Sequence, residues 1–160
     1  MISILVVCLG NICRSPAWQA CFQKIIDDHK KTQEYYVDSC GLRSSFCGQM
    51  PDIRTKKAAE KKGITLSHIA REFELSDYTT FDYILAVTSE IKRDLSSLAP
   101  DDLSRKKVHL LTHFSKLHKD KDIEDPYYGG EDAFDCMIEV LFEIANAFFF
   151  HLENNRKLHV

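Results

Sequence analysis

The sequence lacks the features that mark several classes of protein. No apolar run approaches the ~18 residues of a membrane-spanning helix, so no membrane attachment is expected. The 21 basic and 24 acidic residues give a net charge of −3, without the basic surplus of a nucleic-acid-binding protein. The chain begins with MISILVVCLGN, which has neither a basic segment nor a signal-peptidase site, and this favours a cytoplasmic protein.

Internal repeats, low-complexity tracts and interdomain linkers are also absent from the sequence, so we expect residues 1–160 to form a single domain. Hydrophobic residues make up 44% of the chain and charged residues 28%, which excludes a disordered protein. In the cytoplasm the six cysteines should be reduced thiols, which favours catalytic or inert roles over a disulfide framework.

Strand-like and helix-like patterns alternate along the chain. Strands are predicted at residues 2–7, 35–39, 81–87 and 108–111. Helices are predicted at residues 17–28, 55–62, 90–98 and 133–152, with a short one starting at 76–77 and a loop at 40–51. This alternation predicts an α/β fold, a small doubly wound parallel sheet flanked by helices. Ligands of such sheets bind beyond the carboxyl ends of the strands, which directs attention to residues 8–15.

That segment consists of a cysteine, five residues, an arginine and a serine: Cys8-Leu9-Gly10-Asn11-Ile12-Cys13-Arg14-Ser15. Between a strand and a helix, its backbone N–H groups can converge on one point and bind an anion. Arg14 can add a bidentate contact to two phosphate oxygens. The same positive field would hold Cys8 as a thiolate, a nucleophile aimed at phosphorus.

Three further residues of the segment fit this interpretation. Gly10 is expected to allow a positive φ or a close approach to the ligand, and Asn11 could do the same or tie the loop with its amide. Ser15 could donate its hydroxyl to the Cys8 sulfur. The alternative is a strand-end cysteine and a helix-start arginine in an ordinary salt bridge, but the apolar strand before the segment and Ser15-Pro16 at its end favour the anion site.

The run VCLGNICRSP at residues 7–16, with DPYYG at 125–129, resembles the low-molecular-weight protein tyrosine phosphatases. The similarity extends from Ile2 to about Leu152 and includes VDS at 37–39, SHIAR at 67–71 and FDYIL at 81–85. The resemblance implies a four-stranded sheet and hydrolysis through a cysteinyl-phosphate intermediate without metal or other cofactor. It also implies Cys8 as nucleophile, Arg14 as phosphate clamp, Ser15 as thiolate partner and Asp125 as general acid.

Asp125 stands in a motif that could serve either chemistry or structure. A positioned acid that protonates the departing oxygen contributes ~10²–10⁴-fold to such a hydrolysis. In the alternative, Asp125-Pro126 starts a turn and both tyrosines cover the core, but the anion-binding segment favours the acid. Tyr127 and Tyr128 would then supply stacking surface for an aryl substrate.

The resemblance also suggests residues that support or shape the site. Asn11, Ser39 and His68 are expected to form a hydrogen-bond network, although His68 could be an ordinary structural histidine. Asp38 and Arg93 are expected to pair. The chain departs from the family pattern at Gln19, Ser45 and Thr88, and the aromatic residue of the cleft loop is Phe46. The substrate-binding residues are therefore predicted to be Leu9, Gly10, Asn11, Ile12, Cys13, Ser15, Phe46, Tyr127 and Tyr128.

The other cysteines and histidines permit weaker hypotheses. Cys13 lies five residues after Cys8 and could form a disulfide with it under oxidation, or be a small apolar residue at a helix start. Core positions are predicted for Cys21 and Cys136, and no role is assigned to the loop cysteines Cys40 and Cys47. A metal site is disfavoured because the histidines at 109, 113 and 118 lack the spacing of known zinc motifs.

We expect an enzyme that hydrolyses protein phosphotyrosine and small aryl phosphates, and a monomer or weak homodimer. An arsenate reductase would need resolving cysteines near the end of the third strand, and residues 81–89 contain none. A phosphotyrosine-binding pseudophosphatase would be expected to lack Cys8, Arg14 or Asp125, and all three are present.

Overall fold

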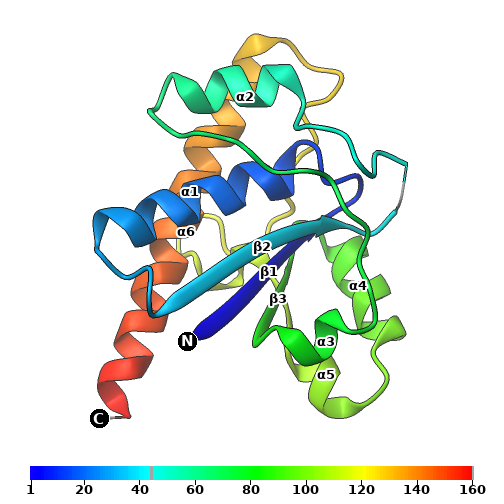
Figure 1. Ribbon diagram of the computed structural model, residues 1–160, viewed down its shortest axis with the longest axis vertical. Helices are drawn as coiled ribbons and strands as arrows, with labels where there is room; N and C mark the ends of the chain where they lie inside the picture. Colours follow the sequence, from blue (N-terminus) through cyan, green and yellow to red (C-terminus); the bar gives the residue numbers. More distant parts are fainter. Residues whose placement is uncertain (44, 160) are drawn as a thin grey trace.

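Four parallel strands form one sheet in the order β2-β1-β3-β4, as the computed structural model shows for residues 1–43 and 45–159 (Figure 1). They are β1 (Ile2–Cys8), β2 (Tyr35–Gly41), β3 (Tyr83–Ala86) and β4 (Val108–Leu110). The central strand β1 pairs with β2 and β3, and its residues 4–7 are fully buried. This explains its continuous apolar run, because a strand covered on both faces has no solvent side.

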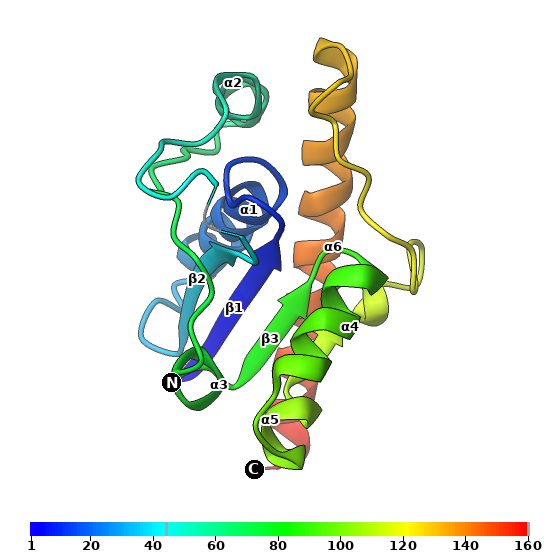
Figure 2. The ribbon, with the colours of Figure 1, turned by 90° about the vertical axis from the view of Figure 1, so that its right-hand side faces the viewer.

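Helices cover both faces of the sheet, which confirms the predicted α/β class (Figure 2). The helices are α1 (Arg14–Asp28), α2 (Ile53–Glu60), α3 (Asp77–Thr80), α4 (Ser89–Leu98), α5 (Asp102–Lys106), the 3₁₀ turn η1 (Leu111–Phe114) and α6 (Glu131–Leu158). α1 packs against α6 on one side, while α4 and α5 pack against β3 and β4 on the other. Both layers leave the carboxyl ends of the strands open, where the loop after β1 lies.

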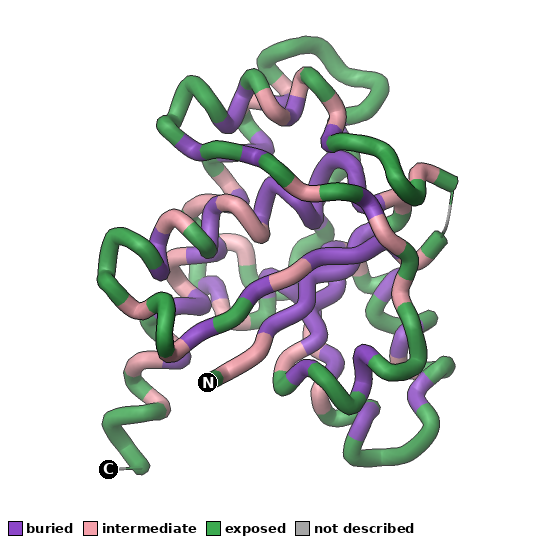
Figure 3. The backbone as a smooth tube through the Cα atoms, viewed as in Figure 1, coloured by how far each residue is buried: buried purple, intermediate pink, exposed green. Residues whose placement is uncertain are grey.

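Aromatic side chains fill the space between α1, α6 and the sheet. Trp18 stacks on Phe22 with ring centroids 5.0 Å apart, and both rings contact Phe148 of α6 at 5.9 and 5.7 Å. All three are fully buried, in agreement with the concentration of buried residues in β1 and α1 (Figure 3). This packing anchors the start of α1 and therefore the end of the loop that precedes it.

The predicted boundaries differ from the observed ones where tertiary contacts extend an element. β2 runs on to Gly41, whose N–H donates to Arg71 O and whose carbonyl accepts from Phe73 N, both at 2.8 Å. The sequence had suggested a loop at Cys40, but this residue lies in a buried strand. The sequence patterns also missed α5 and η1, which are too short for a clear helical period.

Within the described ranges, no helix combines the length and the apolar character that crossing a membrane requires.

Candidate active site

The loop between β1 and α1, residues 8–15, curls around the sulfur of Cys8. Asn11 has the left-handed φ of +59°, and its N–H donates to Cys8 Sγ at 3.2 Å. The positive φ therefore falls on Asn11, not on Gly10. Glycine is needed at position 10 for another reason, because a Cβ there would lie 2.6 Å from the Phe46 ring. The missing side chain allows the aromatic ring to pack directly on the loop backbone.

Ser15 faces the Cys8 sulfur from the first turn of α1. The Ser15 Oγ lies 2.9 Å from Cys8 Sγ and accepts a hydrogen bond from Asn11 Nδ2 at 2.8 Å. Since that bond occupies a lone pair of the hydroxyl, its proton is free to point at the sulfur, with Cys40 O the more distant alternative at 3.4 Å. The arrangement suits a Cys8 thiolate, which can only accept hydrogen bonds.

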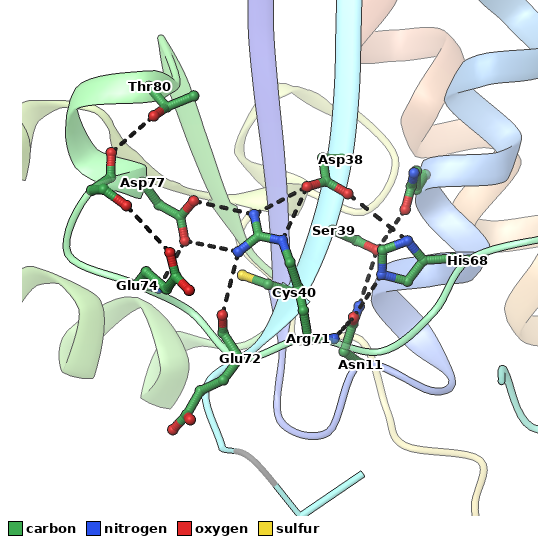
Figure 4. Close-up of polar contacts among 12 residues, drawn as sticks. Asn11, Asp38, Ser39, Cys40, His68, Arg71, Glu72, Glu74, Asp77 and Thr80 are labelled. Carbon is green, nitrogen blue, oxygen red and sulfur yellow. Dashed lines mark hydrogen bonds and ion pairs between the residues drawn. The ribbon is translucent and has the colours of Figure 1, made fainter. Parts of the chain in front are cut away.

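The side-chain amide of Asn11 joins the loop to two other segments, β2 and residues 68–71 (Figure 4). Its Oδ1 accepts from His68 Nε2 at 2.7 Å and from Arg71 N at 3.0 Å. Its Nδ2 donates to Ser15 and, at 3.0 Å, to Ser39 Oγ. The amide is 1% exposed and makes all four of its possible hydrogen bonds. The structure thus brings together the supporting residues that the sequence analysis named.

Gln19 and Arg71 belong to the same network, although the sequence analysis gave neither a role. Ser39 Oγ donates to Gln19 Oε1 at 2.6 Å, which orients the hydroxyl that receives the Asn11 amide. Gln19 stands one helical turn after Ser15 on α1, and that spacing was the available signal. Arg71 ends the SHIAR run at 67–71, but the sequence did not indicate its partners, because its contacts with Asn11 and Asp38 join residues 60 and 33 positions apart.

Asp38 pairs with Arg71 and not with Arg93. The Arg71 guanidinium lies 3.0 Å from the Asp38 carboxylate and 3.1 Å from that of Asp77 (Figure 4). Burial opposes the charge of Arg71, but the hydrogen bonds to Asp77 and the nearby Asp38 raise its pKa above the usual arginine value. Arg93 is exposed on α4. The expected pairing of Asp38 with Arg93 was wrong because residues 71–73 run alongside the end of β2, which places Arg71 next to Asp38.

Arg14 and Asp125 meet beside the loop. The Arg14 guanidinium is buried, donates to Ile123 O at 3.1 Å and lies 3.6 Å from Asp125 Oδ2. The Asp125 side chain is 48% exposed, and its Oδ1 accepts from Tyr127 N at 3.1 Å. Arg14 therefore connects the loop at residues 8–15 to the segment at 123–127, while the Asp125 carboxylate keeps contact with solvent.

Arg54 of α2 fastens the same segment from the other side. It donates to Tyr127 O at 2.8 Å, and its guanidinium lies over the rings of Tyr127 and Phe134 at 5.1 and 4.5 Å. Asp52 holds the guanidinium with two hydrogen bonds of 3.0 and 2.8 Å, and the Asp52 N–H donates to Ile12 O at 2.8 Å. This contact chain links the Cys8 loop to the Asp125 segment, and the sequence gave no sign of it.

A cavity of about 390 Å³ opens above Cys8. Its lining includes six residues of the loop, Asp125 and the three predicted aromatic residues: Cys8, Leu9, Gly10, Ile12, Cys13, Arg14, Arg43, Ser45, Phe46, Asp125, Tyr127 and Tyr128. Asn11 and Ser15, which were also predicted to bind substrate, are buried and do not line it. Cys8 is only 2% exposed at its floor, whereas Tyr128 is 97% exposed at its mouth. The cavity is a slot with a buried floor around Cys8 and aromatic sides, a shape that could accommodate an aryl group.

The cysteines fall into three environments. Cys13 lines the cavity, with its sulfur 3.0 Å from Thr55 Oγ1, and burial raises its pKa to about 12. Cys21 is fully buried, as expected, but Cys136 is exposed on α6 and is not a core residue. All six cysteines are free thiols.

The histidines at 109, 113 and 118 do not gather. His113 faces Asp120 at 3.2 Å and His118 faces Glu143 at 2.9 Å, both on the surface. Throughout residues 1–43 and 45–159, no group of three or more His, Cys, Asp or Glu side chains is arranged to hold a metal ion.

Comparisons with known proteins agree with this geometry. The family model "Low molecular weight phosphotyrosine protein phosphatase" matches residues 3–158. A protein of that name from Gallus gallus is 40% identical over 147 residues, which cover 91% of this chain and 92% of the relative. A solved protein tyrosine phosphatase from Entamoeba histolytica has a TM-score of 0.92 and 35% identity, covering 98% of this chain and 99% of that one.

A second solved structure is the YwlE arginine phosphatase, with a TM-score of 0.88 and 25% identity over 98% of this chain and 99% of that one. It is a cysteine-to-serine mutant whose active-site serine is phosphorylated.

The His68 contact makes stability depend on pH. Burial lowers the pKa of His68 below its usual value of about 6.5, although the Asp38 carboxylate opposes the shift. A depressed pKa means that the unfolded state binds the proton more readily. The contribution of neutral His68 to folding stability is therefore fully present above about pH 6.5, and it is lost as the pH falls through the lower pKa of His68 in the folded state.

We expect the difference in unfolding free energy between the wild type and His68→Gln to shrink from pH 7 to pH 5, as measured by urea denaturation. Histidines that both proteins share cancel in the difference. An offset for His68→Gln that does not change with pH would contradict the assignment.

Proposed function

Because this chain belongs to the low molecular weight phosphotyrosine protein phosphatase family and is a protein tyrosine phosphatase, we propose that it hydrolyses protein phosphotyrosine and small aryl phosphates through a cysteinyl-phosphate intermediate. The observation that carries the proposal is the environment of Cys8 Sγ. Ser15 Oγ at 2.9 Å and the Asn11 N–H at 3.2 Å both face the sulfur, at the floor of a cavity that Arg14 and Asp125 also line.

In the first step, the loop N–H groups and Arg14 bind the phosphate oxygens, and the Cys8 thiolate attacks phosphorus. A sulfur–phosphorus bond forms as the bond from phosphorus to the phenolic oxygen breaks. Asp125 donates its proton to that oxygen, so tyrosine leaves as a neutral phenol. The phosphorylated serine of the YwlE mutant supports this route, since the substituted cysteine position carries the phosphoryl group there.

In the second step, a water molecule attacks phosphorus through its oxygen, and the Asp125 carboxylate accepts a proton from that water. The sulfur–phosphorus bond breaks, Cys8 returns to the thiolate, and the hydrogen bond from Ser15 stabilises the departing sulfur. Phosphate then leaves the loop. The 48% exposure of the Asp125 side chain supports this role, because water can reach the carboxylate.

The cleft favours a flat ring as the leaving group. Phe46, Tyr127 and Tyr128 supply aromatic surface, and the Tyr127 and Tyr128 rings meet edge to face at 5.1 Å. Such walls suit the phenyl ring of phosphotyrosine better than the flexible chain of phosphoserine. Ser39 and His68 act at a distance by holding Asn11. The proposal further includes one domain over residues 1–160, a cytoplasmic location in keeping with six free cysteines, and a monomer or weak homodimer.

The nucleophile is tested by Cys8→Ser, which should lower p-nitrophenyl phosphate turnover by roughly 10⁴-fold or more, measured with EDTA present. A serine hydroxyl remains protonated and attacks poorly, while the loop should still bind orthophosphate. Cys136→Ser, at an exposed cysteine outside the cleft, is the matched control and should keep its activity. Turnover by Cys8→Ser near the wild-type rate would exclude the assignment.

The acid is tested by Asp125→Asn, which should lower kcat on phenyl phosphate by ~10²-fold or more. The loss should be smaller for esters such as p-nitrophenyl phosphate, whose leaving groups need less protonation. Asp132→Asn, an exposed aspartate in the first turn of α6, serves as control. If good and poor leaving groups lose activity equally, Asp125 has a structural role instead.

The redox hypothesis for Cys13 forms part of the proposal. Peroxide would convert the Cys8 thiolate to a sulfenic acid, and the Cys13 thiol would attack that sulfur, release water and form a disulfide. The burial that raises the pKa of Cys13 to about 12 keeps this thiol protonated, so the loop must distort before the second step. Loss of the contact between Cys13 Sγ and Thr55 would accompany that change.

We expect peroxide to inactivate the wild type and a thiol reductant to restore it, with orthophosphate protecting the enzyme. Cys13→Ser should recover less completely, because without a resolving thiol Cys8 proceeds to the irreversible sulfinic acid. Peptide mapping after brief peroxide treatment identifies the bond. A disulfide between other cysteines, or full recovery of Cys13→Ser, would leave Cys13 as a structural residue.

A further inference from the structure

Arg43 is an arginine on the cavity wall for which the catalytic steps give no role. It directly follows β2, and the ladder between β1 and β2 continues into the loop, with Leu42 N donating to Cys8 O at 2.9 Å and Arg43 N to Leu9 O at 3.0 Å. The backbone of Arg43 is therefore fixed beside the phosphate-binding loop, while its side chain is exposed and lines the cavity.

The other arginines near the cavity already have partners. Arg14 is buried, donates to Ile123 O and lies beside Asp125. Arg54 is held by Asp52 and donates to Tyr127 O. In the part of the chain that the structure describes, no carboxylate forms an ion pair with Arg43. Arg43 is thus a cation at the cleft whose charge is available to a ligand.

A bound phosphopeptide would bring its neighbouring residues to this position. The phosphate must reach Cys8 at the buried floor, so the tyrosine side chain occupies the cavity and the peptide backbone stays at the mouth. Adjacent Cα atoms lie only about 3.8 Å apart, so the residues that flank the phosphotyrosine also lie at the mouth. The exposed parts of the lining there include Leu9, Arg43 and Tyr128.

We propose that Arg43 binds an acidic side chain adjacent to the phosphotyrosine, so that acidic phosphopeptides are the preferred substrate class. The inference rests on the proposed function and specifies the substrate of the same site. A guanidinium can bind a carboxylate with two parallel hydrogen bonds. Because Arg43 is exposed, the gain should be modest and should decrease with ionic strength.

The test compares two phosphotyrosine peptides, one with glutamate on both sides of the phosphotyrosine and one with glutamine at the same positions. The readout is the ratio of kcat/KM for the acidic peptide to that for the neutral peptide. It is measured for the wild type, Arg43→Gln and Arg43→Lys. Lys106→Gln is the matched charge control, because Lys106 is exposed on α5, which precedes β4 at the opposite end of the sheet.

The wild type should prefer the acidic peptide by about 2- to 5-fold at low salt, mainly through a lower KM. Arg43→Gln should bring the ratio close to one, Arg43→Lys should retain part of it, and Lys106→Gln should leave it unchanged. The wild-type preference should also decrease in 0.5 M sodium chloride. An unchanged ratio in Arg43→Gln would overturn the proposal. If kcat/KM falls equally for both peptides, so that the ratio is unchanged, Arg43 acts on the phosphate or the loop instead.

A binding measurement separates this proposal from the catalytic one. Titration of Cys8→Ser and of Cys8→Ser combined with Arg43→Gln gives the ratio of Kd values for the two peptides without turnover. A preference for the acidic peptide that disappears with Arg43 supports the subsite even if the wild type hydrolyses neither peptide. Equal Kd ratios in the two proteins would overturn it even if catalysis proceeds as proposed.

Discussion

The active-site loop depends on the buried amide of Asn11. Its backbone adopts a φ of +59°, and the side chain makes four hydrogen bonds, to Ser15, Ser39, His68 and the N–H of Arg71. A buried amide that loses one partner bears the cost of an unsatisfied polar group, about 1–3 kcal/mol. Three segments of the chain, namely the loop at residues 8–15, β2 and residues 68–71, are therefore held together at one point.

The same contacts arrange the polar groups around the Cys8 sulfur at the floor of the cavity. The amide of Asn11 donates to Ser15, which leaves the hydroxyl proton free to face Cys8, and the Asn11 N–H faces the same sulfur. Groups that are already oriented toward a charge need no reorganisation during the reaction. Gln19 and Arg71 extend the support outward, since one orients Ser39 and the other is itself fixed between two carboxylates.

A second set of contacts places the carboxylate of Asp125 relative to that floor. Arg14 reaches Asp125 from the loop, and Arg54 reaches Tyr127 from α2 while Asp52 bonds to Ile12 O. The aromatic side of the cleft and Asp125, the proposed general acid, are therefore tied to the loop at residues 8–15. Such coupling matters because a misplacement of about 1 Å can cost ~10²-fold in rate.

The sequence by itself determined the parallel α/β fold, the loop at residues 8–15 and the aromatic residues near Asp125. These features are local: apolar runs indicate strands, and a cysteine, glycine, asparagine and arginine within eight residues predict an anion-binding turn. Only the tertiary structure decided that Arg71 pairs with Asp38, that Arg54 anchors Tyr127 and that no carboxylate of the described residues pairs with Arg43. The first two contacts join residues 33 and 73 positions apart, and a separation of that length leaves no periodic trace in the sequence.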